Sequence, residues 1–190
     1  MRIVAGRFRG ARLAAPKGDA VRPTSDRVRE AVLNILEHGI DGFEIEGARV
    51  LDLFAGTGAL GLEALSRGAR YALFIEQSAE ARALLRRNIE ALELTGCTKI
   101  WRRDAAGLGP AGNMAPFDLV FLDPPYDRGL GERALAAAHA GGWIAPGGLA
   151  VLEERESATV ALPEGFAERD RRLYGDTQVL FLTAETGDGG

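Results

Sequence analysis

Apolar residues along the chain form short continuous runs that alternate with longer amphipathic stretches, a pattern that predicts strands alternating with helices. The predicted strands cover Arg49–Phe54, Tyr71–Ile75, Lys99–Trp101, Phe117–Leu122 and Leu149–Leu152, the last after a turn at Pro146-Gly147-Gly148. The predicted helices cover Asp26–His38, Ala59–Arg67, a stretch capped by Ser78 that reaches about Leu94, and Glu132–Ala140. Such alternation is typical of a mostly parallel sheet with helices on both faces.

The two ends of the chain depart from this alternation. Arg2–Leu13 alternates around two glycines and predicts a short β-hairpin, and Arg169–Leu173 with Thr177–Thr183 predicts a terminal antiparallel hairpin around Gly175-Asp176. The sequence therefore predicts an α/β fold with a seven-stranded sheet. We expect three parts: a basic N-terminal arm over residues 1–24, one main domain over residues 25–184, and a disordered tail over residues 185–190.

Composition narrows the class of protein. At 190 residues with 46% apolar content, the chain suits one domain with a substantial core. It has neither an apolar stretch of membrane-span length nor an N-terminal signal-peptide block, and its single cysteine, Cys97, fits a reducing cytoplasm. Cys97 is expected to be structural. His38 and His139 have no partner at ligand spacing, so no metal site is expected.

The charge distribution matters more than the net charge of −4, which by itself argues against a nucleic-acid partner. Residues 1–30 carry eight basic and three acidic groups, a net charge of +5, whereas the rest of the chain carries −9. A basic arm on an acidic body is typical of local contact with a polyanion. A solvated, arginine-rich strand pair explains the same charges, and charge alone does not separate the two interpretations.

The loop after the fourth predicted strand, Asp123-Pro124-Pro125-Tyr126, carries the most informative signal. It stands at the C-terminal end of the apolar run Phe117–Leu122, the edge of an open α/β sheet where ligands bind. Asp123 and the Pro124 carbonyl can accept hydrogen bonds from a planar NH2 group while Tyr126 stacks on the attached ring. The prolines fix φ and have no N–H, which keeps the loop stiff. The alternative is an ordinary turn, since Asp and Pro are common turn residues.

A second loop, Gly56–Gly61, lies between the first strand of the alternating region and the following helix. Its glycines permit close approach of a ligand to free N–H groups at the helix N-terminus. As a bare G-x-G-x-x-G pattern with Glu76 twenty residues later, it also fits a dinucleotide-binding site, so a nicotinamide-dependent enzyme is a rival interpretation.

Three acidic residues at successive strand ends favour a different cofactor. Asp52 would repel a pyrophosphate but attract a cationic amino-acid group. Glu76 suits ribose hydroxyls, and Asp104 suits an exocyclic adenine amine. S-adenosylmethionine fits all three positions, although each acid taken singly could be a helix cap or a salt-bridge partner.

Several segments resemble known methyltransferases. Asp52–Gly58 resembles the first motif of class I S-adenosylmethionine-dependent methyltransferases, and Asp123–Tyr126 resembles the (Asp/Asn)-Pro-Pro-(Tyr/Phe) motif of members that methylate amino nitrogens. Longer blocks resemble the bacterial RsmD family, and the resemblance extends nearly to the end of the chain. These blocks are Arg2–Gly6, Arg22–Glu30 and Gly58–Gly68, and the resemblance reaches as far as Tyr174–Thr177.

The resemblance implies a Rossmann-like class I methyltransferase that uses S-adenosylmethionine to methylate a guanine N2 in 16S rRNA. The expected substrate is the assembled or assembling small ribosomal subunit, and the expected enzyme is a cytoplasmic monomer. The expected catalytic residues are Asp123, Pro124, Pro125 and Tyr126. The expected cofactor-binding residues are Asp52, Phe54, Ala55, Gly56, Thr57, Gly58, Glu76, Gln77, Asp104 and Ala105. The expected RNA-binding residues are Arg7, Arg9, Arg12, Arg22, Thr24 and Arg27.

Other substrates and functions stay open at this point. A DNA adenine-N6 or protein glutamine methyltransferase would share the Asp123–Tyr126 motif, but would usually bring an additional recognition region. A nicotinamide-dependent oxidoreductase lacks an evident hydride-transfer site here. A non-catalytic RNA-binding module would have little reason to keep both loops intact.

Overall fold

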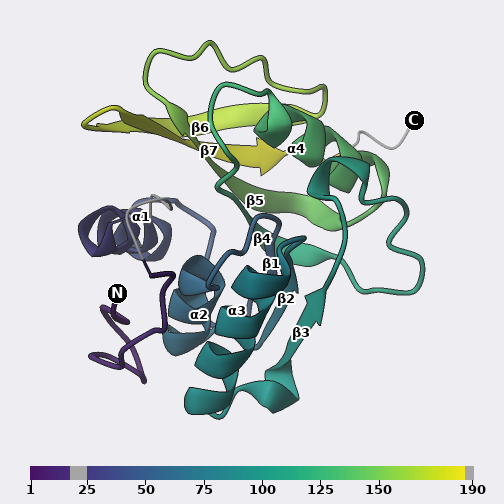
Figure 1. Ribbon diagram of the computed structural model, residues 1–190. Helices are drawn as coiled ribbons and strands as arrows, with labels where there is room; N and C mark the ends of the chain where they lie inside the picture. Colours follow the sequence, from purple (N-terminus) through teal and green to yellow (C-terminus); the bar gives the residue numbers. More distant parts are fainter. Residues whose placement is uncertain (18–24, 187–190) are drawn as a thin grey trace.

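In the computed structural model, which describes residues 1–17 and 25–186, the chain forms a seven-stranded sheet with the order β3-β2-β1-β4-β5-β7-β6 (Figure 1). Strands β3 to β5 along this order are parallel, and β7 runs antiparallel to both β5 and β6. The strands are β1 (Arg49–Asp52), β2 (Tyr71–Ile75), β3 (Thr98–Trp101), β4 (Phe117–Leu122), β5 (Ile144–Arg155), β6 (Phe166–Tyr174) and β7 (Thr177–Ala184).

Four α-helices follow the predicted pattern. They are α1 (Asp26–His38), α2 (Ala59–Ser66), α3 (Ala79–Ala91) and α4 (Leu130–Ala140), with short 3-10 turns at Thr95–Cys97 and Ala105–Gly107. The hydroxyls of Ser25 and Ser78 accept the N–H groups of Val28 and Ala81, which caps α1 and α3 at their free amide ends.

The core lies in two layers, one on each face of the sheet. One layer packs α1, α2 and α3 against alternate strand residues such as Val50, Phe74 and Phe121. The other packs α4 and the Ala105–Gly107 turn against the intervening strand residues, with Trp143 fully buried among them. Period-2 alternation thus divides each buried strand between the two layers, and the parallel sheet is covered on both sides.

The predicted N-terminal hairpin is present only as a minimal one. Arg2 and Arg12 form an isolated antiparallel bridge, and the Ile3 N–H donates to the Ala11 carbonyl at 2.9 Å. Ile3 and Leu13 are buried in the core, so the described part of the arm packs against the domain instead of standing apart from it. Figure 1 shows this segment in purple beside α2.

A buried charged cluster joins the arm to α1 and α2. The Glu63 carboxylate accepts the N–H groups of Val4 and Ala5 and lies 3.6 Å from Arg29 Nε and 3.4 Å from Arg67 Nε. Arg29 and Glu63 are both 0% exposed. Arg29, which contributes to the positive charge of the N-terminal segment, is therefore a structural cation and is not available to a polyanion.

Several predicted boundaries differ from the structure. Strand β1 ends at Asp52, not Phe54, and α4 begins two residues before Glu132. The turn predicted at Pro146-Gly147-Gly148 lies within β5, which is twelve residues long and carries a register shift where it pairs with β4. The register shift accommodates the irregular backbone at Gly147, where φ is +73°.

Two further expectations fall partly outside the described residues. Residues 18–24, which include Arg22 and Thr24, and residues 187–190 of the predicted tail are not described. At the near end of that tail, the Glu185 N–H donates to the Gly165 carbonyl at 2.8 Å. No helix in residues 1–17 and 25–186 is long and apolar enough to cross a membrane.

Candidate active site

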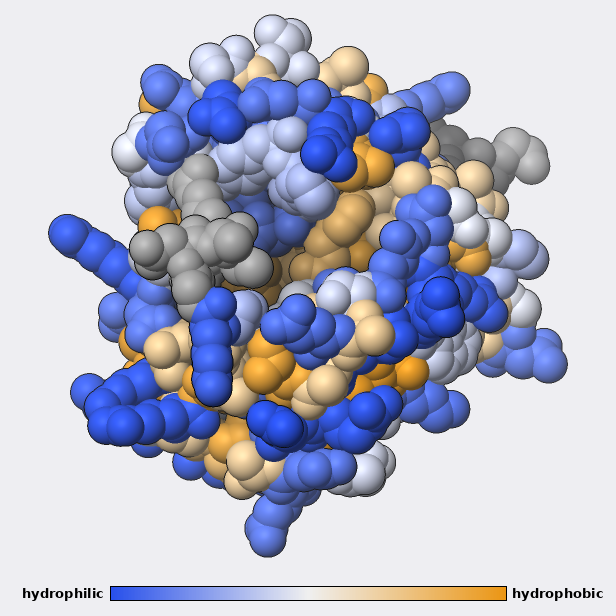
Figure 2. All heavy atoms as spheres, in the orientation of Figure 1, coloured by the Kyte–Doolittle hydropathy of each residue, from blue (hydrophilic) through white to orange (hydrophobic). Residues whose placement is uncertain are grey.

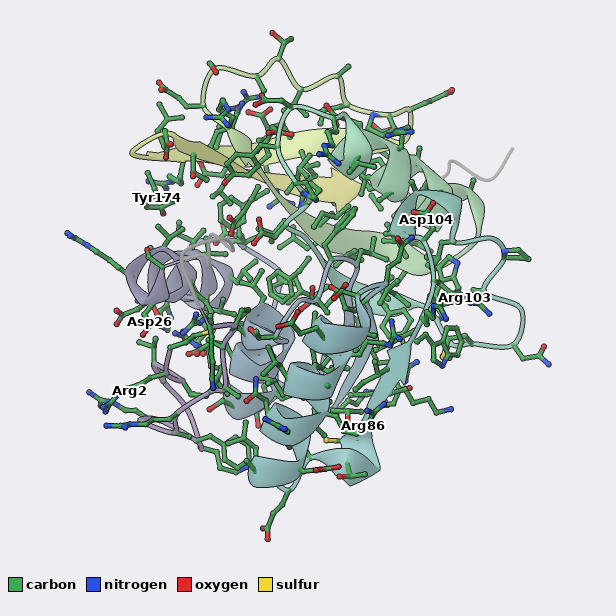
Figure 3. The ribbon with its side chains drawn as sticks, viewed as in Figure 1. Arg2, Asp26, Arg86, Arg103, Asp104 and Tyr174 are labelled. Carbon is green, nitrogen blue, oxygen red and sulfur yellow. The ribbon has the colours of Figure 1, made fainter. Side chains whose placement is uncertain are left out.

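A cleft of about 1480 Å³ opens at the carboxyl ends of the parallel strands. Its walls come from both ends of the described part of the N-terminal arm, the loops after β1, β2, β3 and β4, the carboxyl ends of β5 and β6, and the first residues of β7 and α1. Figure 2 shows this face of the molecule hollowed near its centre, with apolar residues inside and hydrophilic residues around the opening. Tyr174 and Asp104 both line the cleft, and Figure 3 shows them on opposite sides of the view.

The glycine loop after β1 has the geometry that the sequence predicts for a ligand-binding turn. Gly56 has a φ of +54°, and a Cβ at this position would point into open space, so a ligand can approach the backbone closely. Gly58 has a φ of +84°, and a Cβ there would lie 2.2 Å from Leu85 Cδ1. Gly58 therefore holds the loop against α3, while Gly56 leaves room beside it.

Asp52 is a buried acid whose environment strongly perturbs its pKa. It is 1% exposed, its Oδ2 accepts the Gly61 N–H at 3.2 Å, and its Oδ1 has no hydrogen-bond partner within the described structure. Burial raises the pKa of Asp52 from 3.8 to about 7; the Gly61 N–H opposes this, and the carboxylates of Asp123 and Glu76 add to it. All three acids line the same cleft, and a cationic ligand there would relieve their mutual repulsion.

The two other predicted cofactor acids also border the cleft. Glu76 follows β2 and accepts the Gly56 N–H at 2.8 Å and the Ser78 N–H at 2.7 Å, so it links the glycine loop to the start of α3. Asp104 follows β3 and accepts the Ala106 N–H at 3.0 Å. Each carboxylate keeps further lone pairs for a ligand, because the two backbone donors at Glu76 and the one at Asp104 use only part of its acceptor capacity.

The Asp123–Tyr126 loop forms the facing wall of the same cleft. Pro124 is buried and Pro125 exposed. The Tyr126 hydroxyl lies 3.1 Å from Thr177 Oγ1, and the Arg155 guanidinium lies 5.7 Å from the centre of the Tyr126 ring. Thr177, the first residue of β7, thereby holds the hydroxyl end of the aromatic ring.

The structure brings most of the predicted site residues together. All four predicted catalytic residues and every predicted cofactor residue except Gly58 line the cleft. Gly58 does not line the cleft; it packs against Leu85 of α3 instead. Arg7, Arg9, Arg12 and Arg27 are exposed but do not line the cleft. In Figure 3, Arg2 of the arm points away from the body of the protein.

Several cleft residues were not predicted from the sequence. Arg128 follows the catalytic loop, Glu153 and Arg155 lie at the end of β5, and Tyr174 and Thr177 belong to the terminal hairpin. The rule that ligands bind at carboxyl strand ends would have found Glu153 and Arg155 once β5 had been extended to its true length. Tyr174 and Thr177 lie where the family resemblance ends, but the strand-end rule does not find them, because an antiparallel hairpin reaches this edge only through the tertiary fold.

The donor set of the cleft suits S-adenosylmethionine. The buried Asp52 Oδ1 without a partner, the converging acids and the open backbone at Gly56 all favour a ligand that carries positive charge and approaches the loop closely. Among residues 1–17 and 25–186, no group of three or more His, Cys, Asp or Glu side chains could hold a metal ion.

The sheet order, the antiparallel β7 and the glycine loop at the end of β1 define a class I methyltransferase. Residues 1–183 match the family model described as conserved hypothetical protein 95. The chain therefore belongs to this family, the RsmD family.

Individual relatives agree with this assignment. Ribosomal RNA small subunit methyltransferase D of Escherichia coli (strain K12) is 35% identical over 176 residues, which cover 92% of this chain and 85% of the relative. The protein of the same name from Haemophilus influenzae is 34% identical over 177 residues, covering 92% and 89%. The solved structure of yhhF from Escherichia coli covers 98% of both chains with a TM-score of 0.82 at 32% identity.

Proposed function

We propose that this protein transfers a methyl group from S-adenosylmethionine to the exocyclic N2 of a guanine in 16S rRNA. One observation carries the proposal: the Asp123–Tyr126 loop and the glycine loop with Asp52 line the same cleft at the carboxyl edge of the sheet. Membership of the RsmD family, together with the names of its relatives, supports rRNA of the small subunit as the substrate.

The cofactor half of the cleft would bind S-adenosylmethionine through the glycine loop and the three acids. Asp52 would attract the amino end, Glu76 would accept hydrogen bonds from the ribose hydroxyls, and Asp104 would accept one from the adenine amine. The bound cofactor supplies an electrophilic methyl group on a good leaving group. The protein therefore has mainly to align the nitrogen, the methyl carbon and the sulfur.

The other half of the cleft would present the target amine. The N2 lone pair of guanine is delocalised into the ring, so the amine is a poor nucleophile. Hydrogen bonds from the NH2 to the Asp123 carboxylate and the Pro124 carbonyl would favour a pyramidal nitrogen and stabilise the positive charge that develops on it. Asp123 would receive the proton after transfer. Tyr126 would hold the base by stacking, which requires the base to lie outside any helix.

The N-terminal arm would contact the RNA backbone. Arg7 and Arg9 are exposed on its turn, Arg12 is exposed at the bridge to Arg2, and Arg27 is exposed on the first turn of α1. The arm is modest in charge, which fits a substrate that is an assembled or assembling subunit, where ribosomal proteins provide part of the contact surface. On this proposal the protein acts in the cytoplasm as a monomer.

The test uses labelled S-adenosylmethionine with small subunits that lack the modification, with naked rRNA, and with duplex DNA in separate reactions. We expect label on a guanine N2 of 16S rRNA. We also expect Asp123→Ala to lower kcat by about 10²–10³-fold, the usual cost of removing one group that stabilises transition-state charge. The affinity of this variant for S-adenosylmethionine should stay within about twofold of the wild-type affinity, which is a free-energy change of about 0.4 kcal/mol. Label only in DNA or in a ribosomal protein would contradict the proposal.

A further inference from the structure

The loop that would present the target amine connects β4 to α4, and on the way its residue Asp127 contacts β5. Its entrance is fixed by the pairing of β4 with β5, where Leu122 lies opposite Leu152. Next to this pairing, Pro124 packs over α4: a Cβ on Gly131 would lie 3.4 Å from Pro124 Cγ and 2.4 Å from Leu152 Cδ1. The first half of the loop is thus held by backbone pairing and by a close approach that only glycine allows.

The exit of the loop is held differently. Asp127 follows Tyr126 with a φ of +62°, a left-handed conformation that is unfavourable for a residue with a side chain. Its backbone N–H donates to the Glu154 carboxylate, with 3.2 Å between Asp127 N and Glu154 Oε1. The same oxygen accepts the Arg155 N–H at 2.7 Å. One carboxylate oxygen on β5 therefore joins the loop exit to the end of the strand.

The Glu154 carboxylate is buried, so it depends on its hydrogen-bond donors. Glu154 is 3% exposed, and a buried carboxylate is retained only where hydrogen-bond donors compensate for its lost hydration. The described structure gives it backbone N–H donors, not a buried cation, so its contacts are directional and sensitive to its length. A charge-assisted hydrogen bond to an amide can maintain the left-handed backbone at Asp127, which by itself is strained.

The other tether at the loop exit is weaker. Arg155 Nε lies 2.7 Å from Asp127 Oδ2, but these side chains are 42% and 54% exposed, and exposed ion pairs contribute little. The hydrogen bond from the Asp127 backbone ends on a carboxylate buried from solvent, whereas the ion pair between Arg155 and Asp127 is exposed to it. The two contacts act on the same residue, so their effects can be separated by mutation.

We propose that Glu154 is a positioning residue for methyl transfer: by holding the Asp127 amide, it fixes where the Pro124 carbonyl and the Tyr126 ring stand. The inference rests on the proposed function, because it assigns these two groups to the target base. It does not place Glu154 in contact with substrate or cofactor.

The test compares variants that differ in the reach of the side chain. Glu154→Asp keeps the charge but shortens the side chain by about 1.5 Å, one C–C bond. Glu154→Gln keeps the length and an oxygen acceptor. Asp127→Asn is the matched control, since it removes the exposed ion pair and leaves the backbone N–H in place. Hydrogen–deuterium exchange of the free protein reports the protection of the Asp127 amide, and single-turnover methylation of small subunits reports the chemical step.

We expect Glu154→Asp to increase exchange at Asp127 and to lower the rate of the chemical step by about 10–100-fold, because a displacement of about 1 Å can cost a factor of 10². The affinity for S-adenosylmethionine should not change, whereas the midpoint of thermal unfolding should fall by a few degrees, because the shortened carboxylate stays buried with weaker hydrogen bonds. Glu154→Gln should restore the rate to within about threefold, and Asp127→Asn should resemble the wild type, as expected for removal of an exposed ion pair that contributes little.

Three results would overturn the inference. They are unchanged exchange and rate in Glu154→Asp, an equal loss in Asp127→Asn, or a loss of cofactor affinity that accompanies the loss of rate. A wild-type protein that methylates no small subunit would contradict the proposed function instead, and the exchange measurement would still show whether Glu154 holds the loop.

Discussion

Asn88 of α3 donates a hydrogen bond of 2.9 Å from Nδ2 to the carbonyl of Thr57 in the glycine loop. The same side chain, 2% exposed, accepts the Ala14 N–H at 2.7 Å and donates to the Ala14 carbonyl at 3.1 Å. One buried amide thus joins the N-terminal arm to the loop that would bind the cofactor. The arm and the glycine loop are therefore connected through α3.

Removing this amide should loosen both segments together. Asn88→Ala leaves backbone groups of Ala14 and Thr57 without partners, and we expect a loss of about 1–3 kcal/mol in the free energy of unfolding. Affinity for S-adenosylmethionine should fall by about tenfold, equivalent to about 1.4 kcal/mol. Urea denaturation and isothermal titration calorimetry measure the two effects. Asn113→Ala, at an exposed position, is the control. Normal stability together with normal affinity in Asn88→Ala would show that the amide does not link the segments.

Cofactor affinity should depend on pH through Asp52. Its pKa is raised from 3.8 to about 7, so near neutrality a substantial fraction of the free protein carries a protonated Asp52. A cationic ligand favours the carboxylate, so binding releases a proton and affinity should rise between about pH 6 and about pH 8. Titration calorimetry in buffers of different ionisation enthalpy would detect the proton. Asp52→Asn should flatten the profile, and a pH-independent affinity in the wild type would contradict this role.

The same raised pKa predicts how the stability of the free protein responds to pH. A group whose pKa is higher in the folded state than in the unfolded chain contributes stability at low pH. For Asp52 this contribution is fully present below about pH 3.8 and is lost as the pH rises through about 7. Thermal unfolding of the wild type and Asp52→Asn from about pH 5 to about pH 8 should show the wild type losing stability relative to the variant as the pH rises. Parallel curves for the two proteins would exclude this contribution.

Tyr126 should act through its ring more than through its hydroxyl. Tyr126→Phe removes only the hydroxyl that meets Thr177 Oγ1 and keeps the stacking surface, so we expect kcat/KM within about fivefold of the wild type, about 1 kcal/mol. Tyr126→Ala removes the ring, and loss of base stacking should cost about 1–3 kcal/mol in kcat/KM. Steady-state kinetics on small subunits separates the two variants. Equal losses would assign the role to the hydroxyl.

The arm should make binding to RNA sensitive to salt. Charge reversal at Arg7 or Arg9 should weaken binding and reduce the slope of log K against log salt by about one for each phosphate that the variant no longer neutralises. Filter binding or fluorescence anisotropy over a salt series measures this slope. Arg70→Glu provides a control, because Arg70 is exposed just before β2, at the amino-terminal edge of the sheet away from the cleft. An equal change in Arg70→Glu would indicate a general effect of charge and not binding by the arm.

Glu63 should be required for stability and not for chemistry. Glu63→Ala removes the buried carboxylate that Arg29 and Arg67 share and leaves them with the more exposed Asp26 and Glu37, and loss of a buried partner costs about 3–5 kcal/mol. Chemical denaturation measures the change, and Glu90→Ala on the exposed face of α3 should stay within about 0.5 kcal/mol of the wild type. A small effect in Glu63→Ala would mean that the buried cluster does not hold the arm.

The sequence determined the alternating strands and helices, the glycine loop and the Asp123–Tyr126 loop, because each depends on local periodicity or on residues with fixed backbone preferences. The position of each motif at a strand end followed from the same pattern. Since parallel strands end at one edge, the sequence also predicted that Asp52, Glu76, Asp104 and Asp123 would share a cleft, and they do.

Only the tertiary structure decided which charged side chains are exposed to a ligand and which residues complete the walls of the cleft. Arg29 and Arg27 stand two positions apart in one basic segment, yet Arg29 is buried against Glu63 while Arg27 is exposed. The local sequence pattern does not distinguish the two arginines, because the burial of Arg29 depends on Glu63, which α2 places opposite α1. Thr177 reaches Tyr126, and Glu154 reaches Asp127, across 51 and 27 positions of the sequence. The packing of β5 and β7 brings these pairs together, and no short-range property of the sequence specifies them.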